Sequence, residues 1–405
     1  MQNRDMSLEI KSRFPIFTAH PDLVYLDNAA TTQKPDTVIA RITEFYKEGN
    51  ANIHRGVYPL AAQATTDFEA SRDKVQQFIN AAKREEVLFN SGTTAGTNLV
   101  AQSFALPRLQ KGDNIVISAM EHHANLIPWQ VICQEVGAEL RVIPMNKDGE
   151  LDQKAYSTLL SDRTRLVALV HISNTLGTIN PVEEMVSTAK QKGIPVLLDV
   201  AQSIAHYPID VQALECDFLV FSGHKLFGPT GIGVLYGKEE WLEQMNPYQY
   251  GGDMIRDVTF SQTTFAGLPN KFEAGTPNIA GAIGLGEAID FLASIDRAQV
   301  LQNLKELQNY AESSLLSIES LKLVGMAKDR TAIFSFAFAD IHPHDIATFL
   351  GEAKIATRAG HHCTQPIMDF FGLPATTRAS FSIYNTTADV DRLVQTLRDI
   401  KAFFS

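Results

Sequence analysis

Short apolar runs alternate with helix-like segments over residues 24–240, and turn-forming residues bound each run. The clearest runs fall at 114–118, 141–143, 166–170, 195–199, 218–221 and 232–236. Strands that are apolar on both faces are typical of a parallel sheet covered by helices on each side. The pattern therefore predicts an α/β fold with a mainly parallel central sheet flanked by helices.

The pattern changes near residue 290. Apolar residues then recur at the spacing of an amphipathic helix, at Val300, Leu304, Leu307, Ala311 and Leu315. Beyond it we expect a strand at 332–338, a helix at 343–350, strands at 354–357 and 378–381, and a final helix capped by Thr386 and Asp389. We predict an N-terminal arm at 1–25 that packs with the small domain, a large domain at 26–290, and a smaller α+β C-terminal domain at 291–405.

Bulk composition excludes several classes of partner. The chain has 405 residues, a formal net charge of −11 and a hydrophobic content of 45%. An acidic protein is a poor ligand for nucleic acid, because phosphate binding needs a basic surface. No apolar run approaches the ~18 residues of a membrane helix, and the first residues lack the apolar region of a signal peptide. We expect neither a nucleic-acid nor a membrane partner.

The three cysteines are Cys133, Cys216 and Cys363, which are odd in number and far apart. A disulfide framework is therefore not expected, and a reducing cytoplasm is the predicted location. Without a CxxC pair the usual zinc motifs are missing, so we predict no metal site.

Polar residues follow the predicted strands where each of them ends. His122, Asn174, Asp199, Gln202 and Lys225 all lie at or just after such an end. In open α/β sheets, ligands bind beyond the carboxyl ends of the parallel strands. We therefore expect these five side chains to share one site.

Lys225 lies in the glycine-rich turn Ser222-Gly-His-Lys-Leu-Phe-Gly-Pro-Thr-Gly-Ile-Gly233. A single lysine in a turn is more often a solvated surface residue than a catalyst. A lysine held at a strand end can instead lose solvation and form a Schiff base with pyridoxal phosphate. Other residues must decide between these interpretations.

Pyridoxal phosphate needs an acid for its ring nitrogen, donors for its phosphate and a group to stack on its ring. Asp199 could supply the acid, and His122 the stacking group. Gly92, Thr93 and Thr94 open a helix whose backbone N–H groups and hydroxyls could hold the phosphate, although helix capping alone would explain them. Ser222 and His224 could assist. Together these residues favour a cofactor-binding lysine.

The sequence resembles the group II (SufS/CsdA-type) cysteine desulfurases of the class V aminotransferase family. The resemblance covers essentially the whole chain and is carried by the segments 27–32 (DNAATT), 121–125 (EHHAN), 199–203 (DVAQS), 222–225 (SGHK), 273–278 (EAGTPN) and 358–363 (RAGHHC). It implies a homodimeric pyridoxal-phosphate enzyme of fold type I. Such an enzyme converts L-cysteine to L-alanine, leaves the sulfur as an enzyme persulfide, and supplies it for iron–sulfur cluster assembly or other sulfur trafficking.

The resemblance also assigns roles to residues. Lys225 would carry the Schiff base, Asp199 would pair with the ring nitrogen, and His122 would stack on the ring and take part in catalysis. Gln202 and Asn174 would approach the ring oxygen and the substrate. The phosphate would be held by Thr93, Thr94, Ser222, His224 and Thr276 of the partner subunit. Arg378 would clamp the substrate carboxylate, and the pocket would also include Arg358, His54 and Arg55.

Cys363 differs from the other two cysteines. Buried, inert packing is the default for a free cysteine, and we expect it for Cys133 and Cys216. Cys363 lies in a polar loop with Arg358, His361 and His362, and such surroundings favour the nucleophilic thiolate. We therefore predict that Cys363 takes the sulfur.

Features of two family branches occur together. Ala359 and Gln365 are similar to the CsdA-type branch, whereas His361 and the segment 52–56 are similar to the SUF branch. The short cysteine loop implies a group II enzyme, and such enzymes are commonly stimulated by a small SufE-like sulfur acceptor. The segment 251–265 resembles the hairpin near that docking surface, although it could equally be a dimer contact.

Three alternatives compete with this interpretation. Selenocysteine lyase activity, in which Cys363 would be dispensable, is expected in the same protein. A plain aminotransferase or a kynureninase-like hydrolase would need no nucleophilic cysteine. A non-catalytic sulfur-assembly subunit would have no use for Lys225, Asp199 and Cys363 together.

Overall fold

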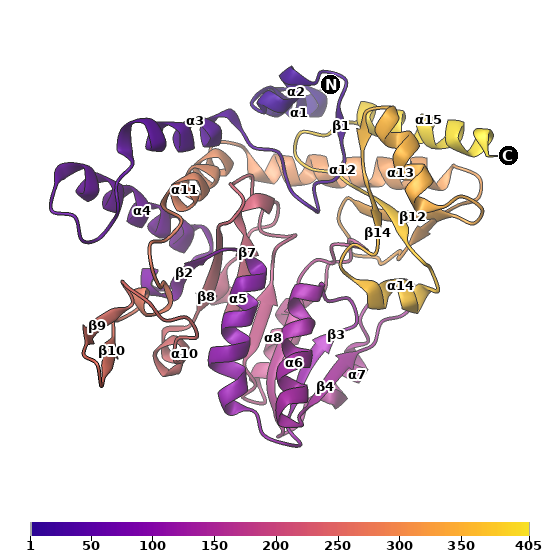
Figure 1. The fold of residues 1–405 in the computed structure, drawn as a ribbon. Coiled ribbons are helices and arrows are strands. Elements are labelled where there is room, and N and C mark those ends of the chain that lie inside the picture. Colours follow the sequence, from indigo (N-terminus) through magenta and orange to yellow (C-terminus); the bar gives the residue numbers. More distant parts are fainter. Residues whose placement is uncertain (1, 405) are drawn as a thin grey trace.

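A computed structural model of the chain describes residues 2–404 and contains a seven-stranded sheet at its centre (Figure 1). In order across the sheet, the strands are β2 (Val87–Asn90), β8 (Gly233–Gly237), β7 (Phe218–Ser222), β6 (Val196–Asp199), β5 (Thr164–Val170), β3 (Asn114–Ser118) and β4 (Glu139–Ile143). Of these seven described strands, only β8 runs against the others. The predicted α/β fold with a mainly parallel central sheet is confirmed.

Alternate residues of each strand enter different hydrophobic cores, which explains the continuous apolar runs. In β5, Val167 and Leu169 pack into one core, and Leu166 and Ala168 pack into the other. The chain up to residue 293 also contains the helices α3 (Asp36–Glu44), α4 (Pro59–Phe78), α5 (Thr93–Leu99), α6 (Ile127–Val136), α7 (Gln153–Leu159), α8 (Val182–Lys190), α9 (Val211–Leu214), α10 (Glu239–Gln244) and α11 (Ile279–Ala293). Helices α4, α8 and α11 contribute to the first core, and α5 and α6 contribute to the second.

The C-terminal part contains a second, antiparallel sheet. Its strands are β11 (Leu321–Val324), β12 (Ile333–Phe338), β15 (Thr376–Ser380) and β14 (Arg358–Gly360), in that order. The helices of this part are α12 (Arg297–Leu316), α13 (Pro343–Glu352), α14 (Gln365–Phe371) and α15 (Thr387–Phe403). The predicted capping box of Thr386 and Asp389 is present at the start of α15.

The strand observed near residues 354–357 is shorter than the predicted one. It is the two-residue strand β13 (Ile355–Ala356), and it lies outside the four-stranded sheet. The reason is a parallel pairing with β1 (Val24–Tyr25) from the N-terminal arm, a partner more than 300 residues away that no local pattern specifies.

The N-terminal arm contains α1 (Gln2–Ser12) and α2 (Pro15–Ala19), which lie near the top of Figure 1. The Phe14 ring makes edge contacts with Phe227, with Phe291 on α11 and with Tyr384 from the C-terminal part. The arm thus contacts both parts of the molecule, while the boundaries at 25 and 290 stay predictions.

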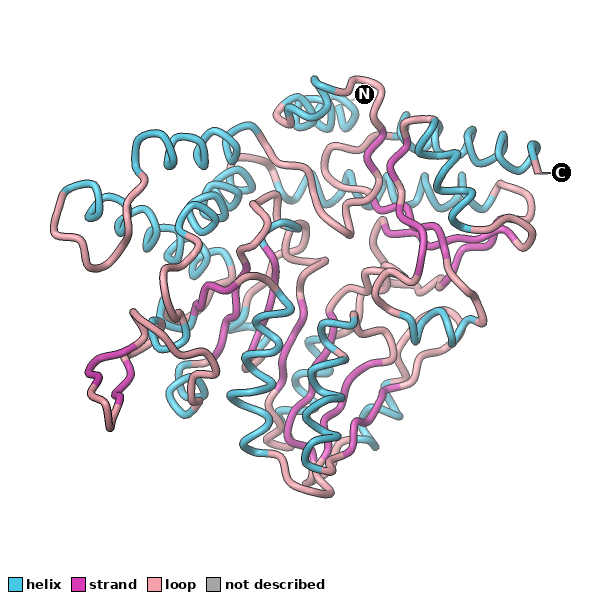
Figure 2. The backbone as a smooth tube through the Cα atoms, in the orientation of Figure 1, coloured by secondary structure: helices cyan, strands magenta, loops and turns pink. Residues whose placement is uncertain are grey.

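Both sheets direct loops toward a common region between them (Figure 2). A hairpin of β9 (Ile255–Val258) and β10 (Thr263–Phe265) projects from the large domain, at the lower left of Figure 1. No helix within residues 2–404 has both the length and the apolar character needed to cross a bilayer.

A buried ion pair joins α4 to the loop before α11. The fully buried Arg72 donates to Glu273 through both terminal nitrogens, at 2.7 and 2.9 Å, and Glu273 also accepts from the Phe89 N–H at 2.7 Å. We expect Glu273→Gln to lower the free energy of unfolding by about 3 kcal/mol, because it removes the more buried of the two carboxylates, Glu273 and Glu69, that pair with the buried Arg72. Urea unfolding measures this. Glu240→Gln, at an exposed site on α10, is the control, and an equal effect of both variants would contradict the prediction.

Candidate active site

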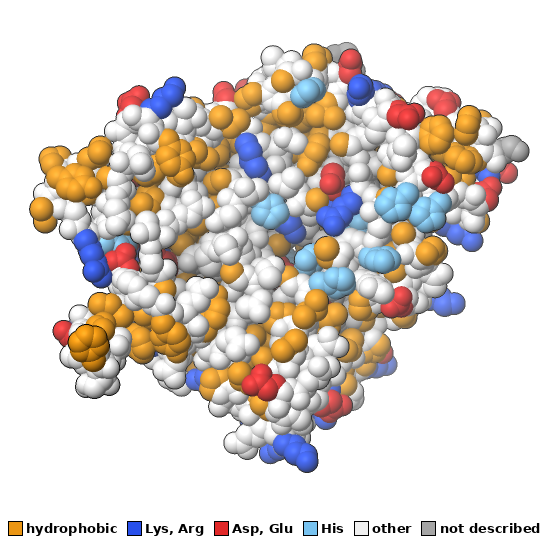
Figure 3. Space-filling view, in the orientation of Figure 1, with side chains coloured by type: hydrophobic (Ala, Val, Ile, Leu, Met, Phe, Trp, Pro, Cys, Tyr) orange, Lys and Arg blue, Asp and Glu red, His pale blue; other side chains and the backbone are white. Residues whose placement is uncertain are grey.

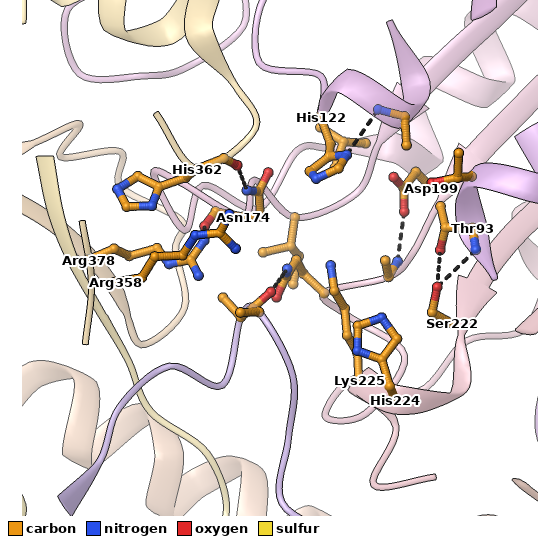
Figure 4. A pocket seen from close by; sticks show the side chains of 18 residues that line it. Thr93, His122, Asn174, Asp199, Ser222, His224, Lys225, Arg358, His362 and Arg378 are labelled. Carbon is orange, nitrogen blue, oxygen red and sulfur yellow. Dashed lines mark hydrogen bonds between the residues drawn. The ribbon is translucent and has the colours of Figure 1, made fainter. Parts of the chain in front are cut away.

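One cavity of about 170 Å³ lies beyond the carboxyl ends of the central strands (Figure 4). It brings together eleven of the predicted site residues: Thr93, Thr94, His122, Asn174, Asp199, Gln202, Ser222, His224, Lys225, Arg358 and Arg378. The first nine end or follow strands of the large sheet, whereas Arg358 and Arg378 lie on β14 and β15 of the small sheet. The site therefore requires both sheets.

The turn that carries Lys225 is held by a segment from the N-terminal region. The carbonyl oxygen of His224, next to Lys225 in the chain, accepts from Thr31 Oγ1, from the N–H and hydroxyl of Thr32, and from Lys34 Nζ, at 2.8–3.1 Å. Thr32 Oγ1 also accepts from the Phe227 N–H at 3.0 Å. The turn backbone is therefore fixed by contacts across about 190 residues of sequence. Sequence reasoning missed Lys34, which carries no motif signal of its own.

Burial lowers the pKa of the Lys225 amine from its ordinary value near 10.5 to about 8. The negative charge of Asp199 opposes this effect, and the positive charge of Arg378 adds to it. Only the neutral amine can attack an aldehyde. Lys225 is therefore reactive at a lower pH than a solvated lysine.

This shift makes a testable prediction. When pyridoxal phosphate is added back to cofactor-free protein, the rate of Schiff-base formation should rise with pH and level off above about pH 8. Stopped-flow absorbance measures the rate. Asp199→Asn should move the midpoint to lower pH, since the Asp199 charge raises the pKa of Lys225. A rate that still rises above pH 10 would show that Lys225 titrates as a solvated amine.

Asp199 is the last residue of β6 and is almost completely buried. Its Oδ1 accepts from the Ala201 N–H at 2.9 Å. Burial raises the pKa of its carboxyl group, and the Ala201 N–H and the Lys225 charge partly offset this. A carboxylate in such an environment gains strongly from a cationic partner.

His122 and Lys225 both point into the cavity (Figure 4). His122 Nδ1 accepts from the Ala124 N–H at 3.0 Å, so the neutral ring carries its proton on Nε2. Burial, reinforced by the Lys225 charge, lowers the pKa of His122 to about 3. His122 is therefore a neutral ring with one N–H to donate.

Glu121 directly precedes His122, and sequence reasoning quoted it only within a motif. Its carboxyl group is bonded to the Ser118 hydroxyl, the Asn125 amide and the Val170 N–H, which link the ends of β3 and β5. Burial raises its pKa to about 8, against the effect of these hydrogen bonds.

Small residues form a cradle at the start of α5. Ser222 Oγ lies 2.9 Å from both the N–H and the hydroxyl of Thr93. Gly92 has φ of +139°, a Cβ there would meet Ser222 Oγ at 3.0 Å, and a Cβ on Gly233 would approach Gly92 Cα to 2.5 Å. Glycine is therefore required at both positions. The resulting hydroxyls and N–H groups suit a phosphate.

Arg378 occupies the opposite end of the cavity. It is almost fully buried, and it donates through Nη1 to the Asn174 carbonyl at 2.9 Å and through Nη2 to Asp27 Oδ1 at 3.0 Å. Within the described residues its Nε has no partner, nor has Asn174 Oδ1. Buried polar atoms of this kind need partners, and a bound carboxylate and hydroxyl would supply them. Sequence reasoning missed Asp27 as the ion-pair partner.

Cys363 lies in the loop between β14 and α14, and its Sγ is 3.8 Å from Arg358 Nη2. It is only partly buried, whereas Cys133 and Cys216 are buried, and burial raises the pKa of their thiols to about 11 and about 12. On this face of the molecule, histidine side chains gather near basic side chains (Figure 3). Cys363 is thus the one partly exposed thiol of the three, and it lies beside a cation.

Three predicted site residues lie away from the cavity in this chain. His54 Nε2 is bonded to Glu69 at 3.1 Å, and Arg55 pairs with Asp253 at 2.9 Å. Thr276 lines a second cavity of about 320 Å³. All three lie in loops, and a single chain does not bring them to the cavity that holds Lys225.

The comparison with protein families places residues 24–393 in the family "Aminotransferase class-V". A cysteine desulfurase from Escherichia coli O127:H6 (strain E2348/69 / EPEC) is 48% identical over 396 residues, which are 97% of this chain and 97% of that protein. The cysteine desulfurase from Escherichia coli (strain K12 / DH10B) has the same identity and coverage.

Solved structures give a consistent result. The cysteine desulfurase CsdA (S-sulfonic acid) from Escherichia coli matches with a TM-score of 0.92 at 40% identity, covering 98% of this chain and 99% of that one. The apo cysteine desulfurase from Thermococcus onnurineus NA1 has a TM-score of 0.93 at 36% identity, with 97% of each chain covered. A NifS-like protein shares the fold, with a TM-score of 0.83 at 23% identity, covering 94% of this chain and 100% of that one.

Proposed function

Because this chain belongs to the class V aminotransferase family and is a cysteine desulfurase, we propose that it moves sulfur from L-cysteine to Cys363 with pyridoxal phosphate held at Lys225. One observation carries the proposal. A single cavity holds Lys225, Asp199 and Arg378, and the partly buried thiol of Cys363 lies beside Arg358, which lines that cavity.

The residues present fit the cofactor. Lys225 would hold its aldehyde, buried Asp199 its ring nitrogen, and His122 its ring face. Thr93, Thr94, Ser222 and His224 would hold its phosphate, and Asn174 Oδ1, which has no partner among the described residues, could accept its ring hydroxyl, with Gln202 nearby. When bound, pyridoxal phosphate withdraws electrons from the α-carbon of the amino acid and so weakens neighbouring bonds.

The protein's own groups would then complete the reaction. Arg378 holds the carboxylate of cysteine, and Lys225 carries the proton at the α-carbon. The Cys363 thiolate attacks the substrate sulfur, so that a sulfur–sulfur bond forms and the carbon–sulfur bond breaks. The electron pair goes to the substrate β-carbon, which takes up a proton, and L-alanine leaves. The Nε2–H of His122 can donate near the sulfur.

The test is to incubate the purified protein with L-cysteine and to measure alanine and sulfide, with and without reductant. With reductant, alanine and sulfide should form in equal amounts over many turnovers. Without reductant, the sulfur should stay on the protein as a persulfide at Cys363, detected by mass spectrometry. Alanine at the background level of a protein-free sample would contradict the proposal.

Selenocysteine lyase activity is a second proposed function. Cys363 does not line the cavity that holds the predicted cofactor residues. A substrate whose leaving group departs without attack by a thiol would therefore not need Cys363. Selenium is such a group, and we propose that L-selenocysteine is also a substrate.

We further propose a homodimer in which Thr276 reaches the phosphate of the partner subunit, with His54 and Arg55 completing its substrate pocket. All three residues lie in loops outside the Lys225 cavity of their own chain, which supports such a role. A small SufE-like acceptor would dock near the β9–β10 hairpin, where Val258 and Phe260 are exposed. It would carry the sulfur toward iron–sulfur cluster assembly. We also propose that the N-terminal arm ends at residue 25 and that the large domain ends at residue 290.

A further inference from the structure

The loop that carries Cys363 has an unusual backbone. His362 and Cys363 have φ of +54° and +59°, so two consecutive non-glycine residues are left-handed. Their Cβ atoms make this conformation unfavourable, and it persists only where neighbouring groups hold it. The contacts of this loop therefore decide where the thiol lies.

The contacts come from both parts of the molecule. Within the loop, the N–H and the hydroxyl of Thr364 both donate to the His361 carbonyl at 2.9 Å. From the large domain, Asn174 Nδ2 donates to the His362 carbonyl at 2.7 Å, and the Thr175 hydroxyl lies 2.6 Å from that of Thr364.

His123 makes the contacts closest to the thiol. Its backbone N–H donates to the Cys363 carbonyl at 2.8 Å, and its ring Nε2 accepts from the Gln365 N–H at 3.1 Å. Gln365 is the first residue of α14. Of the residues named here, His123 alone contacts both Cys363 and Gln365, two positions further along the chain.

The ring of His123 must be neutral for this role. An imidazole that accepts at Nε2 carries its proton on Nδ1, and a protonated ring could not accept at all. Partial burial, with a smaller effect from His361, lowers the pKa of His123 below its ordinary value. The acceptor is therefore available at neutral pH.

We propose that His123 is a positioning residue that clasps the Cys363 loop onto the large domain and so sets where the thiol meets the substrate sulfur. His122, the preceding residue, lines the cofactor cavity. The two adjacent histidines thereby join the cavity wall to the nucleophile loop. This role rests on the proposed function of Cys363.

The test compares His123→Gln, His123→Asn and His123→Ala in the holoenzyme. A glutamine amide oxygen can occupy the place of Nε2, whereas asparagine is too short and alanine has no acceptor. We expect Asn and Ala to lower kcat for alanine formation roughly tenfold, the effect of losing about one hydrogen bond. The KM for cysteine and the absorption of the bound cofactor should stay unchanged, and Gln should restore kcat. His20→Ala, at an exposed site on the N-terminal arm, is the control.

Amide hydrogen exchange over residues 361–367 separates this proposal from the function on which it rests. The Gln365 N–H should exchange faster in the Asn and Ala variants than in the native protein, and Gln should restore protection, whether or not the protein turns over cysteine. Unchanged exchange or unchanged kcat in the Ala variant would overturn the proposed positioning role of His123. A failure of Gln to rescue would do the same, as would a change in KM or in cofactor absorption. If the native protein forms no alanine, the proposed function fails, and the exchange data still decide whether His123 holds the Cys363 loop.

Discussion

Replacing Cys363 with alanine is expected to lower sulfide release from L-cysteine by more than about 10³-fold, because holding a nucleophile at the reacting atom is worth factors of this size or more. The absorption of the bound cofactor should survive, since Cys363 lies outside the residues that line the cavity. Sulfide and alanine assays, with an absorption spectrum of the same sample, measure both effects.

Matched variants sharpen this result. Cys133→Ala and Cys216→Ala remove the two buried thiols and should leave turnover of cysteine largely intact. With L-selenocysteine as substrate, Cys363→Ala should keep most of its activity, because selenium leaves without attack by the thiol. Normal cysteine turnover by Cys363→Ala would assign the protein to a reaction that needs no nucleophilic cysteine, such as transamination or hydrolysis.

Replacing Lys225 with alanine is expected to reduce alanine formation by at least about 10³-fold. In the proposed mechanism the variant loses the amine that would hold the cofactor aldehyde. It also loses the proposed proton carrier at the α-carbon, a role that alone contributes about 10²–10⁴-fold. The Schiff-base absorption should disappear. Pyridoxal phosphate should still bind through the cradle at Gly92 and Ser222, but more weakly than to the native protein.

Lys305→Ala, at an exposed site on α12, is the control and should behave as the native protein. Equilibrium dialysis measures cofactor binding, and an alanine assay measures turnover. If the Lys225 variant kept its Schiff-base absorption, another amine would be the anchor. Lys34, which burial gives a pKa of about 7, would then be the first candidate to replace.

Much of the architecture could be predicted because it depends on short-range patterns. A strand buried on both faces must be apolar throughout, as β5 is, and a capping box needs only Thr386 and Asp389. The family resemblance is also confirmed, since it rests on short motifs spread over the chain. Ligands in open α/β sheets bind beyond the carboxyl ends of the strands, which predicted one shared site. The structure confirms this placement for His122, Asn174, Asp199, Gln202 and Lys225, which all line one cavity.

The roles of individual site residues stay predictions, and several contacts were beyond reach of the sequence. Arg378 meets Asp27 across 351 positions, and Lys34 reaches the His224 carbonyl across 190. Neither pair has a periodicity or a motif that joins its members. The pairing of the strand at 354–357 was beyond reach for the same reason, because its partner lies in the N-terminal arm.

The amino-acid sequence by itself determined the layered α/β architecture and the family and supplied the candidate site residues, because burial patterns, turns and motifs act over a few residues. Tertiary structure alone decided which of those side chains meet. It gathered Lys225, Asp199 and Arg378 around one cavity, left His54, Arg55 and Thr276 outside it in a single chain, and placed His123 against the Cys363 loop. The physical reason is that burial, hydrogen bonding and charge at a site depend on distances between segments, which only the packing of the two sheets establishes.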